Sequence, residues 1–260
     1  TGPGTLVLAA SNSYAGATIV AGGSLRIDDA NALRGGIGAT GGASALILTN
    51  GGVLGIGIGQ TFARDLGTAG DQVRWTGSGG FAAYGADRTV NIGGNTQSLT
   101  WGQTDFVSGD NELVFGAADS THTLIFENSI TLVGTNRFRA NDGAAYVDGR
   151  LTGDIDGTGS FWKTGDGILE LTGSNSWSGG TEVLGGQLLL TGPFSLSGNS
   201  LLTISNFGVV MLATNDFSRP LGTSGGDVQW TGSGGFAAVN GDRVVNLGGA
   251  TGQVTWGSGS

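Results

Sequence analysis

The nine residues WTGSGGFAA at positions 75–83 recur unchanged at positions 230–238, at an offset of 155 in the numbering. Residues on both sides of this stretch recur with the same offset: Phe62 with Phe217, Arg64 with Arg219, Asp87-Arg88 with Asp242-Arg243, and Trp101 with Trp256. Further upstream, residues 1–27 match residues 164–190 at an offset of 163. A chain that repeats itself over this length is built from stacked copies of one unit, so a repeat architecture is expected.

The repeat also predicts how the chain is organised. Residues 1–106 match residues 164–260, and residues 107–163 form the remainder of the repeat unit. The change of offset indicates that loop 28–45 is longer than its counterpart, loop 191–201. No Pro-rich or charged spacer divides the chain, so we expect residues 1–260 to form one continuous unit. Because the sequence begins and ends within a repeat, it is interpreted as a fragment of a longer protein.

Composition limits the class of protein. With 54 glycines but only 3 prolines and no Gly-X-Y period, collagen is excluded. A hydrophobic fraction of 38% is enough for a continuous core and argues against disorder. A net charge of −9 and a single lysine, Lys163, leave no basic surface for nucleic acids or anionic membranes. The absence of cysteine excludes a disulfide framework, thiolate chemistry and a zinc ribbon.

Short segments of alternating hydrophobicity fill the chain and predict an all-β fold. Examples are TLVLAA at 5–10, QVRWTG at 72–77 and ILELTG at 168–173, each bounded by glycine or other turn residues. This period of two is the pattern of strands with one buried face. No window shows the i, i+3, i+4, i+7 spacing of an amphipathic helix.

Exchanges between the two copies indicate which face of each strand is buried. Val7 is replaced by Glu170 and Ile19 by Glu182, while the flanking leucines and valines persist. A face that accepts both valine and glutamate meets water, and the alternate face lies in the core. Leu169→Asp is therefore expected to unfold neighbouring coils, and Glu170→Val to be tolerated. The residues predicted to point inward are Leu6, Leu8, Val20, Leu25, Ile27, Val73, Trp75, Val90, Ile92, Leu99 and Trp101.

Many short one-sided strands fit either a sandwich or a β-solenoid. A sandwich of this length ordinarily divides into domains joined by a linker. A solenoid stacks its coils into one core and hides all strand edges except those at its two ends. We therefore predict a single continuous rod, which at roughly 20 residues per coil would hold about 13 coils.

A longer motif gives the chain a family resemblance. Residues 157–192 read GTGSFWKTGDGILELTGSNSWSGGTEVLGGQLLLTG, which resembles the autotransporter-associated β-strand repeat. The matching residues are Gly157, Gly159, Lys163, Gly165, Gly167, Leu169, Leu171, Gly173, Asn175, Trp177, Gly179, Thr181, Val183, Gly186 and Leu188. In the first copy they are Gly2, Gly4, Leu6, Leu8, Asn12, Tyr14, Gly16, Thr18, Val20, Gly23 and Leu25. That copy lacks the position of Lys163, and Ala10 replaces Gly173.

The resemblance implies a right-handed parallel β-helix from the passenger domain of a Gram-negative autotransporter, secreted or held at the cell surface. In that family the repeat is a stalk with a proposed role in secretion and folding of the passenger. Residues 1–260 contain no counterpart of the family's C-terminal membrane barrel, so contact with a membrane is expected only through such a barrel elsewhere in a parent chain.

Candidates for nucleophilic catalysis are isolated in the sequence. The single histidine, His122, alternates with Thr121 and Thr123 and is interpreted as an exposed or turn-proximal strand residue. Gly222-Thr223-Ser224 resembles the nucleophile tripeptide of subtilisin-like proteases, but the residues that follow depart from that pattern. The other copy has Ala69 in place of the serine. A serine without an adjacent base is an ordinary alcohol.

Acidic and aromatic residues have structural explanations as well. The best carboxylate cluster is Asp154, Asp156 and Asp166 around Lys163, interpreted as solvated turn residues, with weak calcium binding at Asp154 and Asp156 left open. Residues 108–116 match the calcium-binding nonapeptide only faintly, and the GSGG stretches lack the Lys and helix of a phosphate loop. The recurring tryptophans, Trp75, Trp101, Trp230 and Trp256, are predicted to be core residues, and Trp177 to be partly exposed.

These observations favour a non-enzymatic structural or adhesive stalk, whose partner is an unknown extracellular ligand or a host cell surface. Two alternatives remain: a β-helical polysaccharide-degrading enzyme, and an extracellular filament subunit that associates end to end through exposed strand edges. No catalytic, cofactor-binding or metal-binding residue is assigned.

Overall fold

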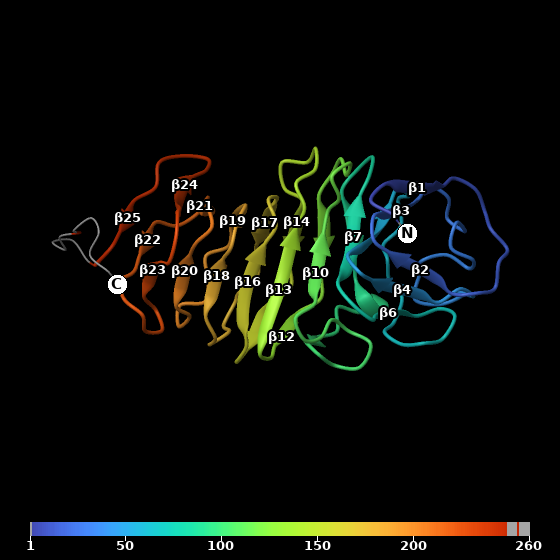
Figure 1. Cartoon of the computed structure of the whole chain (residues 1–260), viewed down its shortest axis with the longest axis horizontal. Coiled ribbons are helices and arrows are strands. Elements are labelled where there is room, and N and C mark those ends of the chain that lie inside the picture. Colours follow the sequence, from blue (N-terminus) through green and yellow to red (C-terminus); the bar gives the residue numbers. More distant parts are fainter. Residues whose placement is uncertain (1, 249–253, 255–260) are drawn as a thin grey trace.

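The computed structural model describes residues 2–248 and 254 and is a parallel β-helix, elongated along the stacking direction of its strands (Figure 1). Every pair of neighbouring strands in its sheets is parallel, and the chain passes from one sheet to another at each corner. The one helical element in the described part is a three-residue 3-10 turn, η1 (Ile92–Gly94). No helix of the described residues is long and apolar enough to span a membrane. The predicted fold is therefore confirmed.

Two long sheets and three short ones form the walls of the rod. The first long sheet contains, in order, β1 (Thr5–Leu8), β3 (Ser24–Ile27), β5 (Gly52–Ile56), β7 (Gly79–Ala83), β10 (Glu112–Phe115), β13 (Thr135–Ala140), β16 (Ser160–Thr164), β18 (Thr181–Val183), β20 (Leu202–Ile204) and β23 (Val228–Trp230). The second contains β8 (Arg88–Val90), β11 (Leu124–Phe126), β14 (Gly149–Leu151), β17 (Ile168–Leu171), β19 (Gln187–Leu190), β21 (Gly208–Leu212) and β24 (Gly234–Ala238). The short sheets are β2 (Thr18–Ala21), β4 (Leu46–Thr49) and β6 (Val73–Trp75); β9 (Leu99–Thr100), β12 (Ile130–Leu132) and β15 (Ile155–Gly157); and β22 (Phe217–Ser218) and β25 (Val245–Asn246).

Coil length varies along the rod, and the predicted number of coils is wrong. Leu6 pairs with Leu25 and Phe161 with Thr181, so these coils have close to the expected length. Gly80, in contrast, pairs with Val114 on the next coil, because long loops are inserted at the corners between them. The longest sheet consequently has 10 strands rather than about 13.

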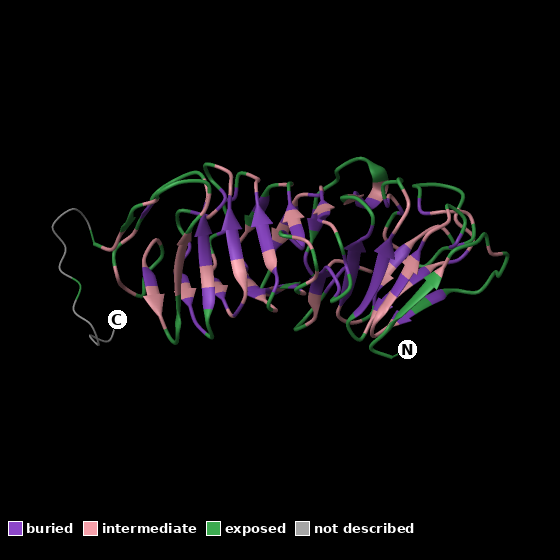
Figure 2. Cartoon of the chain, turned by 90° about the horizontal axis from the view of Figure 1, so that it is seen from above, coloured by how far each residue is buried: buried purple, intermediate pink, exposed green. Residues whose placement is uncertain are grey.

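The core runs along the axis through all but the end coils, as the buried segments of Figure 2 show. Nine of the predicted inward residues are buried, namely Val20, Leu25, Ile27, Val73, Trp75, Val90, Ile92, Leu99 and Trp101. The prediction is wrong for Leu6, which is 62% exposed, and Leu8 is only half-buried. Both lie in β1, which is the edge strand of its sheet and is paired with β3 alone.

The outward face is less uniformly solvated than the sequence indicated. Glu170 points away from the core but is only 6% exposed, because its carboxylate accepts hydrogen bonds from Arg150 Nε at 2.5 Å and Thr191 Oγ1 at 2.8 Å. Glu182 is half-buried beside Trp162 and Thr203 on the neighbouring coils. The exchange of Val7 for Glu170 correctly indicated the outward face of the strand, but it did not indicate the ion pair between Glu170 and Arg150.

The two copies of the repeat lie on different sheets. Strands β1, β3, β5 and β7 of the first copy belong to the ten-stranded sheet, whereas their counterparts β17, β19, β21 and β24 belong to the seven-stranded sheet. Likewise β2, β4 and β6 form a short sheet, while their counterparts β18, β20 and β23 extend the ten-stranded one. The second copy is therefore moved one face around the rod as well as along it.

Burial on the inward face predicts a large cost for a charge. We expect Leu169→Asp to lower the free energy of unfolding by several kcal/mol, because its carboxylate would be buried among apolar neighbours without a partner. Glu170→Val should have an intermediate effect, because it leaves Arg150 unpaired but a third exposed. Gln229→Arg, which copies Arg74 of the first repeat, is the control and should change stability by no more than about 0.5 kcal/mol. If denaturant titration shows that Leu169→Asp loses no more stability than Gln229→Arg, the assignment of Leu169 to the inward face is contradicted.

Candidate functional site

The candidates for catalysis are not brought together. His122 is half-buried in the loop between β10 and β11, where its Nδ1 lies 2.8 Å from Thr121 Oγ1. Ser224 is exposed in the turn before β23, where its backbone N–H donates to Asp227 Oδ2 at 2.9 Å. Among the described residues, neither side chain lies within hydrogen-bond distance of the other or of a carboxylate, so no nucleophile and base form a pair.

The predicted carboxylate cluster is divided between two corners of the rod. Asp154 is exposed in the turn between β14 and β15, where it accepts a hydrogen bond from Ser174 N, and Asp156 is exposed within β15. Asp166 is exposed in the turn between β16 and β17. Over the described residues, no three His, Cys, Asp or Glu side chains are placed to hold a metal ion.

Lys163, in contrast, is fully buried. It occupies an inward position of β16, and its Nζ donates hydrogen bonds to the carbonyl oxygens of Thr164 at 2.9 Å, Gly165 at 2.8 Å and Gly185 at 3.2 Å. Thr164 and Gly165 belong to its own coil and Gly185 to the next, so the three donors of one ammonium group join the corners of two coils. Burial lowers the pKa of Lys163 to about 7, against the attraction of Asp148 and Asp166.

Asp148 lies at the same corner and binds backbone amides rather than carbonyls. Its Oδ1 accepts from Gly143 N and its Oδ2 from Ile168 N, both at 2.9 Å. Burial raises the pKa of this carboxyl group, while the two amide hydrogen bonds and the charge of Lys163 oppose the increase. The corner also requires glycine at Gly186, whose φ is +56° and where a Cβ would lie 2.5 Å from Gly165 O.

Trp177 is fully buried, so the prediction of partial exposure is wrong. Its ring stacks on Phe161 at 5.1 Å, and its Nε1 donates to Thr181 Oγ1 at 3.0 Å. The same threonine hydroxyl lies 2.5 Å from Ser200 Oγ on the following coil. In the first copy, Tyr14, Thr18 and Ser44 form the same chain of hydroxyl contacts, at 2.7 and 2.8 Å. This network explains why the aromatic residue and the threonine of the motif keep a fixed spacing.

Two arginines, which the sequence showed only as residues that recur beside the repeated nonapeptide, bind carbonyl groups at the corners of the rod. Arg64 is fully buried and donates to the carbonyl oxygens of Gly36 and Ser44. Arg219 donates to the carbonyl oxygens of Ser200 at 2.6 Å and Ser197 at 2.7 Å. Burial lowers the pKa of both guanidinium groups. Their recurrence shortly after a phenylalanine was the signal that could have identified them.

Asparagines of the motif have the same role. Asn12 Nδ2 donates to Ala32 O at 3.0 Å, and Asn175 Nδ2 donates to Ser195 O at 2.6 Å, in each case to the next coil. We call the polar set Lys163, Asn175, Trp177, Thr181, Ser200 and Arg219, with Asn12, Tyr14, Thr18, Ser44 and Arg64 in the first copy, the coil clamps. Most of these residues are buried, whereas Asn12 and Arg219 are half-buried and Tyr14 is exposed. Each clamp residue forms hydrogen bonds with backbone groups or with another clamp residue.

The recurring nonapeptide forms a strand, a turn and a second strand with one internal bond. Trp75 Nε1 donates to Gly79 O at 2.9 Å, and Trp230 Nε1 donates to Gly234 O at 3.2 Å. Both tryptophans pack edge-on against the phenylalanine of their copy at 5.9 Å. Trp75 is buried as predicted, whereas Trp230 is only half-buried, because its coil lies near the end of the stack. Trp256 lies outside the described residues.

The buried lysine predicts a specific dependence of stability on pH. The folded protein holds Lys163 with a pKa of about 7, whereas an unfolded lysine titrates near 10.4. Between these values the unfolded state binds the additional proton, so the free energy of unfolding should rise as pH increases from 7 to 10. We expect this rise to be smaller in Lys163→Met when both proteins are titrated with urea at each pH. If the free energy of unfolding changes with pH equally in the two proteins, the lowered pKa assigned to Lys163 is contradicted.

The threonine clamps allow a matched pair of substitutions. Thr181→Val keeps the shape of the side chain but leaves Trp177 Nε1 without an acceptor in a fully buried position, at an expected cost of about 1–3 kcal/mol. Thr18→Val should cost less, because Tyr14 is 37% exposed and its hydroxyl can bind water. Chemical denaturation of both variants tests the difference, and a larger loss for Thr18→Val would refute it.

Comparison with known proteins agrees with this geometry. The family of passenger-associated transport repeats matches the chain twice, at residues 1–27 and 163–190. Searches of curated proteins and of solved structures gave no match. The second matched region begins at Lys163, and both regions contain the clamp aromatic and threonine. The chain is therefore a parallel β-helix in which two segments match the passenger-associated transport repeat, a repeat of autotransporter passenger domains.

Proposed function

We propose that this segment is a non-enzymatic stalk of a secreted or surface-displayed protein of a Gram-negative bacterium, and that it presents adhesive loops along its length. The β-helix supplies the length of the stalk and the repeats supply contacts between coils. Any extracellular ligand or host surface would be met by the loops at the corners of the rod.

The coil clamps carry this proposal. The polar residues that define the repeat bind carbonyl oxygens and hydroxyl groups of neighbouring coils, as Lys163 does at Gly185 and Asn175 at Ser195. A polar residue that binds the backbone of the next coil contributes to stacking and is not free to contact a substrate. The repeated motif therefore supports a role in assembly of the rod.

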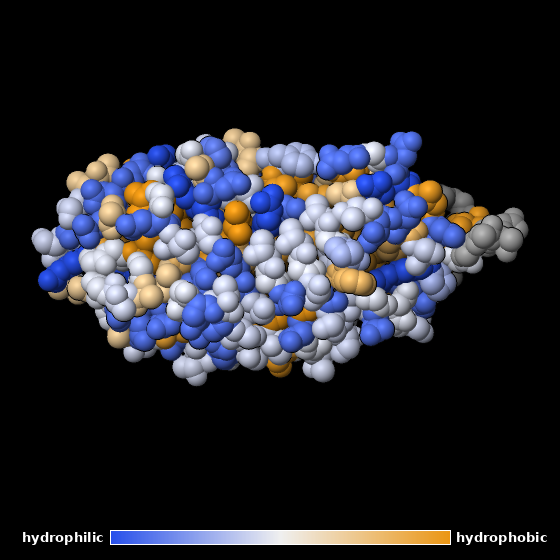
Figure 3. Space-filling view, turned by 180° about the vertical axis from the view of Figure 1, so that it is seen from behind, coloured by the Kyte–Doolittle hydropathy of each residue, from blue (hydrophilic) through white to orange (hydrophobic). Residues whose placement is uncertain are grey.

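The outer surface supports an extracellular location. Only 12% of the residues are charged, and the net charge is −9. On the face seen in Figure 3, hydrophilic and near-neutral residues cover most of the surface, and hydrophobic residues form smaller groups between them. A surface of Ser, Thr, Asn and Gly presents many neutral hydrogen-bonding groups, which suit contacts with carbohydrate or protein loops.

Individual polar residues outside the clamps should be dispensable if the segment is a scaffold. His122→Ala, Ser224→Ala and the double change Asp154→Asn with Asp156→Asn are expected to leave the unfolding free energy and the secreted yield of the parent protein unchanged. Trp177→Ala is the matched positive control, because it empties a core position and should lower both. Secreted yield is measured in culture medium and stability by denaturant titration.

The same variants test the alternative of a polysaccharide-degrading enzyme. Release of reducing sugar from any polysaccharide that disappears with the double aspartate change would overturn the stalk proposal. Retained binding to a glycan or matrix-protein array by all three variants would support an adhesive surface formed by several loops.

A further inference from the structure

The loop between β3 and β4 contains an insertion that the loop between β19 and β20 lacks. Asn12 and Asn175 make equivalent bonds to Ala32 and Ser195, which aligns the two loops up to Leu33 and Leu196. The serines of the clamps, Ser44 and Ser200, align them again at the other end. Between these points the first loop has the additional residues 35–41, GGIGATG, and Ala43 N donates to Arg34 O at 2.9 Å across its base. We call residues 35–41 the insert.

The insert fills a space against the corner that contains Phe62 and Arg64. Ile37 at its centre has 0% exposure and belongs to the main core, and Leu33 beside it is 1% exposed. The carbonyl oxygen of Ile37 accepts a hydrogen bond from Ala63 N at 2.8 Å. The carbonyl oxygen of Gly36 accepts from Arg64 Nε at 3.1 Å. One aliphatic side chain and two carbonyl groups are therefore supplied by the insert.

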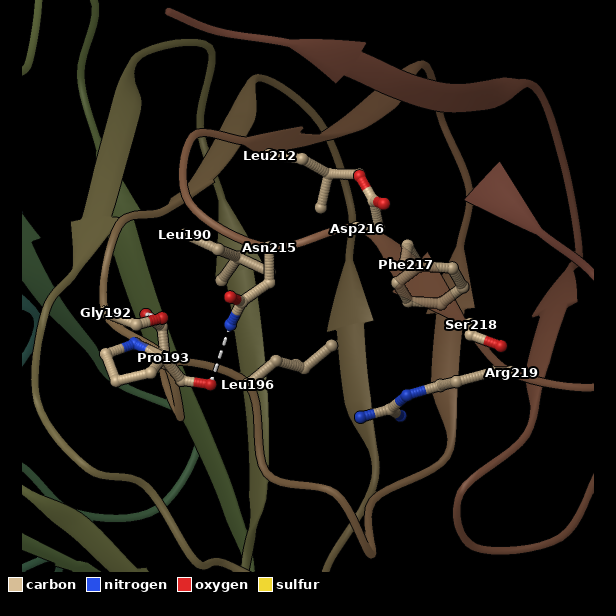
Figure 4. Close-up of a pocket in the computed structure, with 11 residues that line it drawn as sticks. Leu190, Gly192, Pro193, Leu196, Leu212, Asn215, Asp216, Phe217, Ser218 and Arg219 are labelled. Atoms are coloured by element: carbon tan, nitrogen blue, oxygen red, sulfur yellow. Dashed lines mark hydrogen bonds between the residues drawn. The ribbon is translucent and has the colours of Figure 1, made fainter. Parts of the chain in front are cut away.

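The corresponding place in the second copy is an open cavity of about 170 Å³. Figure 4 shows Leu190, Leu196, Leu212 and Phe217 around it, with Arg219 at one side. Leu196 is only half-buried, although its counterpart Leu33 is covered by the insert. A cavity of about 150 Å³ accommodates a ligand of the size of benzene, so this space admits one aliphatic side chain.

One backbone donor of the cavity lacks the acceptor that its counterpart has in the first copy. Arg219 is engaged by Ser197 O and Ser200 O, Asn215 Nδ2 donates to Pro193 O, and Asp216 Oδ1 accepts from Val244 N. Ser218 N, the counterpart of Ala63 N, has no acceptor among residues 2–248. The cavity thus presents leucine and phenylalanine side chains beside a backbone donor that lacks the partner its counterpart has in the first copy.

We propose that this cavity is a binding site for an extended peptide segment with an aliphatic residue flanked by small residues. The aliphatic side chain enters between Leu190, Leu196 and Leu212, and the carbonyl oxygen of the same residue accepts a hydrogen bond from Ser218 N. The occupant is identified by the first copy, in which the protein's own Gly36-Ile37-Gly38 makes these contacts. This site is independent of whether the rod is adhesive.

The insert sequence supplies the probe. Acetyl-GGIGATG-amide added to the isotope-labelled chain should produce saturable NMR shifts at the Ser218 amide and at the methyl groups of Leu196 and Leu212. The peptide GGDGATG is the matched control, and it should bind about tenfold more weakly or worse, because the buried isoleucine is lost. Absence of shifts with the isoleucine peptide at millimolar concentration, or equal shifts with the control, would overturn the proposal.

A graft tests the same site without a free ligand. Insertion of GGIGATG between Ser197 and Gly198 should raise the melting temperature and abolish the peptide-induced shifts, because the cavity would be filled covalently. A graft that folds but still binds the peptide at Ser218 would contradict the assignment. In case the graft does not fold, Leu196→Trp occupies the cavity by a side chain alone and should also abolish binding; persistence of the shifts in that variant would overturn the proposal.

Discussion

Backbone hydrogen bonding between successive coils is the constraint on which the rest of this structure depends. Parallel pairing satisfies the amides and carbonyls along each strand, but at every corner the chain leaves the ladder and turns. Carbonyl groups near the core at these corners need donors, because an unpaired buried carbonyl costs free energy comparable to a lost hydrogen bond. Lys163, Asn175 and Arg219 supply such donors from side chains, and their positions in the repeat follow from that need.

The sidedness of the strands could be predicted because the two copies report it directly. Replacement of Val7 by Glu170 marks the outward face of the strand. The nine inward residues that are buried then follow, because side chains alternate between the two faces of a strand with a period of two residues. Properties of the corners could not be predicted in this way. The burial of Trp177 and Lys163 depends on which carbonyl or hydroxyl group lies opposite, and that is decided by the length of each coil, which differs along the rod. Leu6 was assigned correctly to a face but not to the core, because burial also requires a neighbouring strand.

The clamps and the insert show two ways in which the same corner is completed. Where the insert is present, Arg64 binds Gly36 O, and where it is absent, Arg219 binds Ser197 O instead. The arginine therefore has an acceptor in both copies, but the apolar wall is complete in only one. No single sequence feature predicts the cavity, because it arises from the residues that the second copy lacks. It becomes visible when the two copies are compared in three dimensions.

The displacement of the second copy by one face has a consequence for multivalency. Loops that are equivalent in sequence emerge on different sides of the rod, since β5 and β7 belong to one sheet and β21 and β24 to the other. Two identical partners bound at equivalent loops would therefore point in different directions. Repetition in this chain thus places equivalent loops at different positions around the circumference of the rod, and does not line them up along one face.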